Sequence, residues 1–203
     1  FTGEALKPWA EAGYTCYAFD IQHSKENVNT DTFVGSKGCI TYRHADLHDH
    51  NTLNAIHSEF SDKPVVFGMA FPVCTDMAVS GAAIPYFIEN PVSVLATMWR
   101  KPDHRFHPYE YGGYISYAEA DHPRWPEYIA PRDAYPKKTC LWTGGGFVMP
   151  TASAVPVEKG HSRQHLKLGG KSQRTKDIRS ATPRGFAIAV YEANKVKTMQ
   201  ECI

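Results

Sequence analysis

Short apolar runs, each ending in polar or glycine-rich residues, recur along this chain of 203 residues. Their length and composition predict strands at 14–19, 39–42, 64–69, 87–92 and 137–142, and the apolar run at 64–69 is typical of a strand buried on both faces. Apolar residues at helical spacing predict helices at 6–12, 51–60 and 185–195, with caps near 49–51 and at Thr182 before Pro183. Because strands alternate with helices, the pattern predicts an α/β fold built on a doubly wound, mostly parallel sheet.

The predicted strand at 64–69 is followed by a loop that carries Cys74. A thiol at the carboxyl end of a buried strand stands where open α/β sheets bind their ligands. Cys74 is therefore a candidate nucleophile, and the alternative interpretation is a packed free cysteine. The next predicted strand ends in Glu89 and Asn90, which are candidate partners of the thiol.

A second set of candidate residues follows the first predicted elements. Gly3 lies in a turn before a helix, and the first predicted strand leads to Asp20. In a nucleotide-binding unit, amides at such a turn approach the ligand and such an acid binds ribose hydroxyls. A plain turn at Gly3 and a surface position for Asp20 are the alternatives. Asp46 and Leu47 follow the next predicted strand, beyond a polar segment, 23–38, that is expected to be a loop.

The connection that follows the Cys74 loop is short for the predicted topology. Parallel strands need a crossover of roughly a dozen residues or more. Only a segment near 81–85 is available before the strand at 87–92. Either the two strands are not parallel neighbours, or residues are missing near 82–84. The glycine turn also lacks the strand that should precede it, so further residues are expected before Phe1.

Composition places few limits on function. The formal net charge of +1 and the pI near 7.8 give no general attraction to nucleic acid. Basic residues are concentrated in 159–184, which is either a solvated face or a surface that contacts phosphates. Five cysteines without a C-x-x-C pair favour reduced thiols in the cytoplasm. No apolar run has the length of a membrane span, so no membrane partner is expected.

The length fits a single domain, 1–203, with one unusual segment. Residues 99–161 are rich in aromatic side chains, proline and glycine, which predicts an irregular insert. His104 and His107 have no companion ligands at metal-binding spacing, so no metal is expected.

In this order, the segments resemble the cytosine-C5 DNA methyltransferases, and within them the compact phage-type enzymes. Phe71-Pro72-Val73-Cys74 stands where that family has its Pro-Cys nucleophile loop, and Glu89-Asn90-Pro91-Val92 matches its Glu-Asn-Val motif. Segments 99–102, 107–112 and 138–142 look like the phage-type group, and Arg179-Ser180-Ala181-Thr182 with Gly185 is similar to its closing cofactor motif. The resemblance covers nearly the whole chain.

The resemblance implies a Rossmann-like fold that binds S-adenosylmethionine (SAM). The implied cofactor-binding residues are Phe1, Thr2, Gly3, Asp20, Ile21, Asp46, Leu47, Phe71, Pro72, Ser180 and Thr182. The implied catalytic residues are Cys74, Glu89, Asn90 and Arg179, and the residues expected to contact substrate or DNA are Thr75, Lys138, Arg174 and Arg184. The chain departs from the family at Val73, which replaces a proline, and at Glu4-Ala5, where a second glycine is usual.

The implied chemistry is a covalent methyl transfer to cytosine. The Cys74 thiolate adds to C6 while Glu89 protonates N3, so that C5 becomes enamine-like and takes the methyl group. The C5 proton is then removed and the thiol leaves. Glu89 must stay protonated near neutral pH, which partial burial favours, and Asn90 is either an orienting residue or a strand-end turn residue. The cytosine must be flipped out or single-stranded.

Two other functions are compatible with the same residues. One is C5 modification of free cytosine nucleotides, or modification with a carboxylated SAM analogue whose extra charge would pair with Lys171 or Arg179. The other is an inactive module that binds SAM or DNA. No full target-recognition domain is visible, and 99–161 is the candidate for a reduced one, so short or relaxed sequence specificity is expected. The expected protein is a monomer in the cytoplasm of a bacterium or of a phage-infected host.

Overall fold

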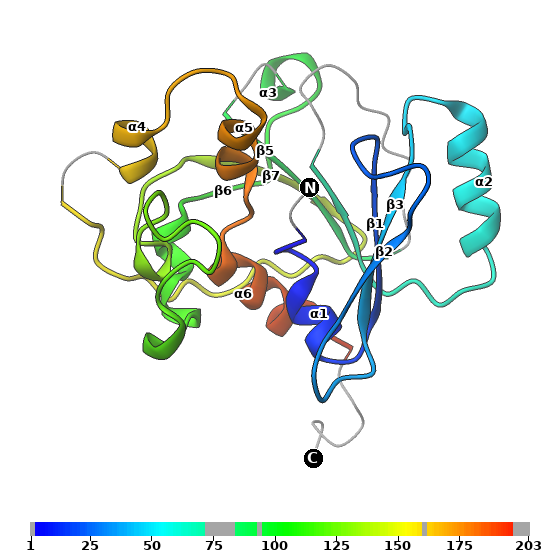
Figure 1. The fold of residues 1–203 in the computed structure, drawn as a ribbon, viewed down its shortest axis with the longest axis horizontal. Helices are drawn as coiled ribbons and strands as arrows, with labels where there is room; N and C mark the ends of the chain where they lie inside the picture. The colour runs from blue at the N-terminus through cyan, green and yellow to red at the C-terminus, as the bar shows by residue number, and fades with distance from the viewer. Residues whose placement is uncertain (1–2, 72–83, 93–94, 160–161, 197–203) are drawn as a thin grey trace.

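The computed structural model describes residues 3–71, 84–92, 95–159 and 162–196, which form two small sheets and the helices around them (Figure 1). The first elements are α1 (Lys7–Glu11), β1 (Thr15–Asp20), β2 (Asn29–Thr32), β3 (Cys39–His44), α2 (His50–Phe60), β4 (Gly68–Ala70) and β5 (Tyr86–Pro91). Next come α3 (Leu95–Met98), β6 (His104–Phe106), the 3₁₀ helices η1 (Pro108–Tyr114), η2 (Tyr117–Glu119) and η3 (Pro131–Asp133), and β7 (Thr139–Gly144). The described chain ends with α4 (Arg163–Lys167), α5 (Gln173–Ser180) and α6 (Arg184–Asn194).

The first sheet has the strand order β1-β3-β2. β1 and β3 are parallel, as predicted for strands joined through other elements, whereas β2 runs antiparallel to β3. The prediction that 23–38 is a loop is wrong at Asn29–Thr32, which is strand β2. All four side chains of β2 are exposed, so this edge strand has none of the apolar alternation that reveals a strand in a sequence.

The second sheet has the strand order β4-β5-β7-β6, in which only β4 and β5 are parallel. The α/β fold is therefore confirmed, but the described strands form two mixed sheets instead of one doubly wound parallel sheet. Because β4 and β5 are parallel neighbours, the first of the two explanations for their short connection is wrong. The second explanation is that residues are missing near 82–84. Residues 82 and 83 lie outside the described residues, so this explanation stays a prediction.

The predicted strand at 64–69 is much shorter in the structure. Only Gly68–Ala70 is in a strand, and Val65 is 40% exposed, so the prediction of a strand buried on both faces is wrong. Proline lacks the N–H that a ladder needs, which explains why Pro64 does not extend the strand. β4 is consequently a short edge strand.

The described residues contain four buried clusters, of which the two largest lie beside the two sheets. The first includes Trp9, Ala18 and Ile40 beside the first sheet, and the second includes Phe87 and other residues of the second sheet and α6. The half-buried side chains of Phe67 and Met69 pack against both clusters. The ring centroids of Trp9 and Phe67 are 4.8 Å apart, so side-chain packing connects the β1 and β4 edges.

Residues 99–161 are joined to the second sheet and to α6. β6 and β7 are strands of this sheet, and between them the chain forms three 3₁₀ helices. The prediction of an irregular segment is wrong at β6, whereas β7 confirms the strand predicted at 137–142. η1 packs closely on α6, because a Cβ atom at Gly185 would overlap the backbone carbonyl of Tyr111. No helix in the described part of the chain is long and apolar enough to cross a membrane.

The N-terminus of α6 is capped from this insert. The predicted cap at Thr182 is wrong, because the cap position is Pro183 and no side chain of the cap residue bonds the helix. Instead, the Gly185 amide donates a hydrogen bond of 3.0 Å to Oδ2 of Asp133, a side chain that is 1% exposed. A carboxylate at the positive end of a helix dipole is a favourable arrangement, and burial of Asp133 raises its pKa.

Candidate functional site

The ends of β1 and β3 bring two predicted cofactor-binding acids to one edge of the first sheet. The strands are parallel with Asp20 in register with His44, so the loop that contains Asp46 starts beside Asp20. The amide of Gln22 donates to Oδ1 of Asp20 at 2.8 Å, and the amide of His48 donates to Oδ1 of Asp46 at 3.0 Å. Each half-buried carboxylate is therefore oriented by one backbone amide, an arrangement that suits binding of a ligand hydroxyl group.

The apolar residues that follow these two acids are exposed. Ile21 is 57% exposed and Leu47 is 47% exposed. Exposed aliphatic side chains beside a carboxylate are suited to pack against a flat ring of a ligand.

The glycine turn lies at the same edge of the sheet. Gly3 has a φ of +75°, a conformation that favours glycine. A Cβ atom at Gly3 would also overlap the hydroxyl of Tyr42, which donates a hydrogen bond of 2.8 Å to Asp31. The turn therefore lies against the tip of the Tyr42 side chain. The predicted cofactor residues Phe1 and Thr2 lie outside the described residues.

Glu89 and Asn90 lie at the end of β5, and both are buried. Glu89 is 6% exposed and Asn90 is 2% exposed. Oε2 of Glu89 has no hydrogen-bond partner among the described residues. Burial raises the pKa of Glu89, and the nearby charge of Lys137 opposes that shift only in part. This environment holds a proton on the carboxyl group to a higher pH than water does, as a general acid requires.

The chain leaves β4 next to Glu89. Ala70 is in register with Ile88 in the parallel pair, so Phe71 starts the following loop beside the end of β5. The ring of Phe71 packs edge-on against Phe87 with centroids 5.8 Å apart. Three predicted site residues follow Phe71 in the sequence: Pro72, Cys74 and Thr75. They lie outside the described residues.

The structure describes three other cysteines, all of them free thiols: Cys16, Cys39 and Cys140. Burial raises the pKa of Cys16 to about 12, so its thiol is a poor nucleophile at neutral pH. Cys140 is 1% exposed within β7. Neither of these buried thiols competes with Cys74 as a candidate.

Helix α5 connects the edge of the first sheet with the region around Glu89. At its start, the Gln173 side chain donates to Oε1 of Gln22 at 3.0 Å. At its end, the carbonyl of Arg179 accepts a hydrogen bond of 2.8 Å from Nζ of Lys137, the cation whose charge acts on Glu89. Six residues of helix span about 9 Å. The two groups of candidate residues are therefore on the same side of the molecule, near the two ends of α5.

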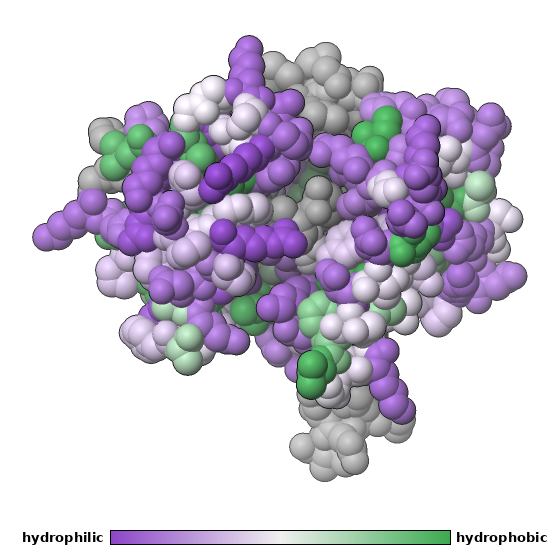
Figure 2. Space-filling view, in the orientation of Figure 1, coloured by the Kyte–Doolittle hydropathy of each residue, from purple (hydrophilic) through white to green (hydrophobic). Residues whose placement is uncertain are grey.

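The predicted basic residues have different surroundings. Arg174 is exposed and lies over the ring of Tyr128 at 5.6 Å, and Lys138 is exposed. The exposed Arg179 donates a hydrogen bond to the carbonyl of Leu168 at 3.0 Å, so part of its guanidinium is used within the fold. Arg184 donates to two carbonyls at the end of η2. Hydrophilic side chains predominate on the surface over α5, whereas α4 also exposes the hydrophobic Leu166 (Figure 2).

The last two predicted cofactor residues lie between α5 and α6. The Ser180 hydroxyl donates to the carbonyl of Asp177 at 3.2 Å, and the side chain of Ser180 is exposed. Thr182 is 5% exposed. Thr182 thus faces the interior, whereas Ser180 faces solvent.

Several polar residues near the candidate site were not predicted from the sequence. Lys137 and the buried Tyr135 both interact electrostatically with Glu89. Glu4 and His122 each have a buried polar atom without a partner among the described residues. No sequence signal marks these residues, because their neighbours are distant along the chain.

No group of three or more potential metal ligands occurs in the ranges that the structure describes. The chain matches no family model, no curated protein and no solved structure. The family resemblance therefore depends on the motifs and their order.

Proposed function

We propose that this protein is a SAM-dependent DNA cytosine-C5 methyltransferase. The observation that carries the proposal is the buried Glu89 at the end of β5, whose raised pKa and unpartnered oxygen suit a proton donor to the N3 atom of cytosine. The position of Glu89, next to the start of the Cys74 loop and in the order shared with the family, supports the same reaction.

The residues of the chain have distinct roles in the proposed reaction. Asp20 and Asp46 bind the hydroxyl and adenine groups of SAM, which supplies an electrophilic methyl group when it is bound. The Cys74 thiolate forms a bond to C6 of the cytosine, and Glu89 gives a proton to N3, so that the electron pair of the C5–C6 bond becomes available at C5. Bound SAM would supply the methyl group to C5 and leave as S-adenosylhomocysteine. Loss of the C5 proton to a base would then restore the double bond and expel the Cys74 thiolate, and N3 would return its proton to Glu89.

We further propose that the two sheets belong to one doubly wound sheet. β1 and β4 are the terminal strands of their sheets, and the side chains of Phe67 and Met69 connect the two cores. Asp20, Asp46 and Glu89 would then lie along one carboxyl edge, which is the usual ligand-binding edge of such sheets.

The test is intact mass spectrometry of the protein incubated with SAM and DNA that contains 5-fluorocytosine. Fluorine at C5 blocks the final elimination, so an active enzyme stays covalently attached to the DNA. We expect an adduct that carries one added methyl group, that is lost in Cys74→Ser and that is reduced at least tenfold in Glu89→Gln, within the usual range for a general acid. Cys39→Ser, a change at a half-buried cysteine outside the site, is the matched control and should react as the wild type does.

The other outcomes separate the competing functions. An added group heavier than methyl indicates a carboxylated donor, and reaction with a fluorinated nucleotide in the absence of DNA indicates a nucleotide substrate. Binding of SAM without a Cys74-dependent adduct on either substrate identifies an inactive module and refutes the proposal.

A further inference from the structure

Two aromatic rings of the segment 122–128 each lie against an arginine at the surface. Cζ of Arg124 is 5.9 Å from the ring centroid of Trp125, and Cζ of Arg174 on α5 is 5.6 Å from the ring centroid of Tyr128. Both arginines are exposed and both rings are half-buried. Neither guanidinium donates a hydrogen bond to a described residue, so both can turn toward a ligand. Surface rings beside arginines are groups on which nucleic-acid bases stack.

Contacts with the rest of the fold hold this segment in place. The amide of Tyr128 donates to the carbonyl of Trp125 at 3.1 Å, so the two rings come from one turn of the chain. The buried ring of His122 stacks on Trp125 with centroids 5.1 Å apart. Arg163 in α4 donates to the carbonyl of Pro126 at 2.8 Å. The rings are therefore presented by a fixed backbone, which lowers the entropic cost of binding.

Helix α5 and the residues before it add positive charge beside the rings. The segment 171–179 carries one acid, Asp177, and four exposed basic residues: Lys171, Arg174, Lys176 and Arg179. The carboxylate of Asp177 accepts a hydrogen bond of 2.8 Å from the Gln173 side chain on the same helix. On the segment 122–128, the charge of Arg124 offsets that of the exposed Glu127. The surface as a whole is positive, which suits the phosphates of a nucleic acid.

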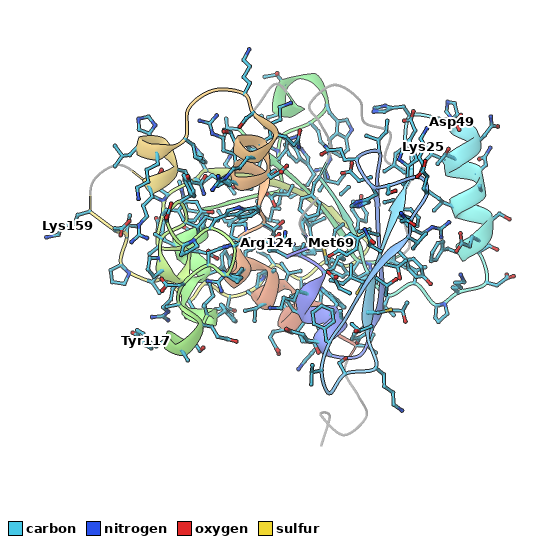
Figure 3. All side chains as sticks on the ribbon, in the orientation of Figure 1. Lys25, Asp49, Met69, Tyr117, Arg124 and Lys159 are labelled. Carbon is cyan, nitrogen blue, oxygen red and sulfur yellow. The ribbon has the colours of Figure 1, made fainter. Side chains whose placement is uncertain are left out.

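This surface lies next to the candidate site. Helix α5 connects the edge of the first sheet with the region around Glu89, through contacts with Gln22 at its start and Lys137 at its end. Figure 3 shows Arg124 near the middle of the molecule, whereas Tyr117 lies at its rim. A strand bound along α5 would therefore pass close to Glu89.

We propose that the segment 122–128 and α5 form a binding surface for single-stranded DNA. Bases stack on Trp125 and Tyr128, while Arg124 and Arg174 pair with the neighbouring phosphates. Only an unpaired strand suits the two rings, because the bases of a duplex are stacked on one another and offer no free face. The binding is independent of sequence, since every base has a face that stacks. The inference rests on the proposed function in one respect, which is the choice of DNA as the polymer.

The test is fluorescence anisotropy of the full chain with a labelled oligothymidylate of about twelve nucleotides. This oligonucleotide contains no cytosine, so methyl transfer does not contribute to the measurement. We expect it to bind at least tenfold more tightly than the same strand paired with oligodeoxyadenylate. In Tyr128→Leu the affinity for the single strand should fall about fivefold or more, as expected for the loss of one stacked base.

Variants of Arg174 separate its charge from any structural role. Arg174→Gln should weaken binding and should make the plot of log affinity against log salt concentration shallower by about 0.7, the change expected for one lost phosphate contact. Arg174→Lys keeps the charge, so its slope should match that of the wild type. Tyr128 and Arg174 belong to none of the buried clusters that the described residues form, so these variants are expected to fold.

A second arginine–aromatic pair provides the matched control. Tyr117 is 84% exposed, and Cζ of Arg132 is 4.2 Å from its ring centroid, but this pair lies outside the proposed surface. Tyr117→Leu should therefore bind the single strand as the wild type does.

The outcomes distinguish this surface from the methyl transfer. Equal binding of single strand and duplex, unchanged binding in Tyr128→Leu and Arg174→Gln, or an equal loss in Tyr117→Leu would overturn the surface. A Cys74-dependent adduct with DNA that contains 5-fluorocytosine would then still support the methyl transfer. Selective binding of the single strand without such an adduct would overturn only the methyl transfer.

Discussion

At the scale of single residues, the acids at the strand ends have contrasting environments. Asp20 and Asp46 are half-buried, and each accepts a backbone amide, which suits acids that bind a ligand in their ionised form. Glu89 is buried with an unpartnered oxygen, which favours its protonated form. The carboxyl groups at these strand ends therefore differ in solvent access and in hydrogen bonding.

The raised pKa of Glu89 predicts a specific pH dependence of folding stability. The folded state binds the proton more tightly than the unfolded state, so the stabilisation from Glu89 protonation is complete below the unfolded pKa. It is lost as the pH rises toward the folded pKa, with a slope of up to about 1.4 kcal/mol per pH unit. In Glu89→Gln this loss is absent, so urea unfolding between about pH 4.5 and 8 should give a variant that becomes more stable, relative to the wild type, as the pH rises.

A matched exposed change isolates this effect. Glu127 is exposed, so Glu127→Gln should follow the pH profile of the wild type. If the Glu89→Gln profile also parallels the wild type, Glu89 does not hold its proton as the buried environment requires, and its role as a proton donor loses its physical basis.

The sequence was sufficient to locate residues that follow a strand, and insufficient to locate residues that meet through tertiary contacts. Asp20, Asp46 and Glu89 each end or follow a predicted strand, and the structure has a strand at each place. Lys137 was not predicted, because Glu89, on which its charge acts, is 48 residues away along the chain. Whether the predicted residues bind SAM or cytosine stays a prediction.

At the scale of elements, the N-terminus of α6 depends on one buried side chain from another segment. Asp133 has a φ of +52° and accepts the amide of Gly185. We expect Asp133→Ala to lower the free energy of unfolding by about 2–3 kcal/mol, because it removes a cap and leaves a buried amide without a partner. Asp133→Asn keeps an acceptor oxygen, and asparagine tolerates positive φ, so it should cost less.

The matched comparison for this prediction is the cap of an exposed helix. Ser172 accepts the amide of Thr175 at the start of α5, and Ser172→Ala should cost about 1 kcal/mol. Urea unfolding of the variants gives the two values. If Asp133→Ala lowers the free energy of unfolding no more than Ser172→Ala does, burial of Asp133 adds nothing to the strength of this cap.

Elements with an apolar pattern were predictable, and those fixed by their neighbours were not. The helix at 51–60 and its cap near 49–51 correspond to α2, whose Asp49 side chain accepts the amides of Asn51 and Thr52. β2 has four exposed side chains and was predicted as loop, because only its pairing with β3 makes it a strand. The α6 cap was misplaced for a similar reason, since Asp133 is 52 residues from the Gly185 amide that it binds.

At the scale of the whole molecule, the two sheets depend on each other through a few side chains. No described backbone ladder joins β1 to β4, and the connection between the two cores includes Phe67 and Met69. The aromatic ring of Phe67 lies 4.8 Å from that of Trp9 and 6.1 Å from that of Phe87. The candidate cofactor residues and Glu89 are on different sheets, so this packing also helps to fix their relative positions.

Phe67→Ala should therefore weaken the coupling between the sheets as well as the total stability. Because Phe67 is only half-buried, we expect a loss of about 2–3 kcal/mol, below the usual range for a fully buried phenylalanine.

Native-state hydrogen exchange measures the opening free energy of each sheet separately. The amides of β3 should lose more protection than those of β7, because the ring of Phe67 lies closer to Trp9 of the first cluster, at 4.8 Å, than to Phe87 of the second, at 6.1 Å. Phe147→Ala is the matched control, because Phe147 is also half-buried but packs only against the second cluster, so β3 should keep more of its protection in that variant. Equal losses in β3 and β7 in both variants would mean that the sheets unfold as one unit, and that Phe67 is not a specific link between the two halves of the candidate site.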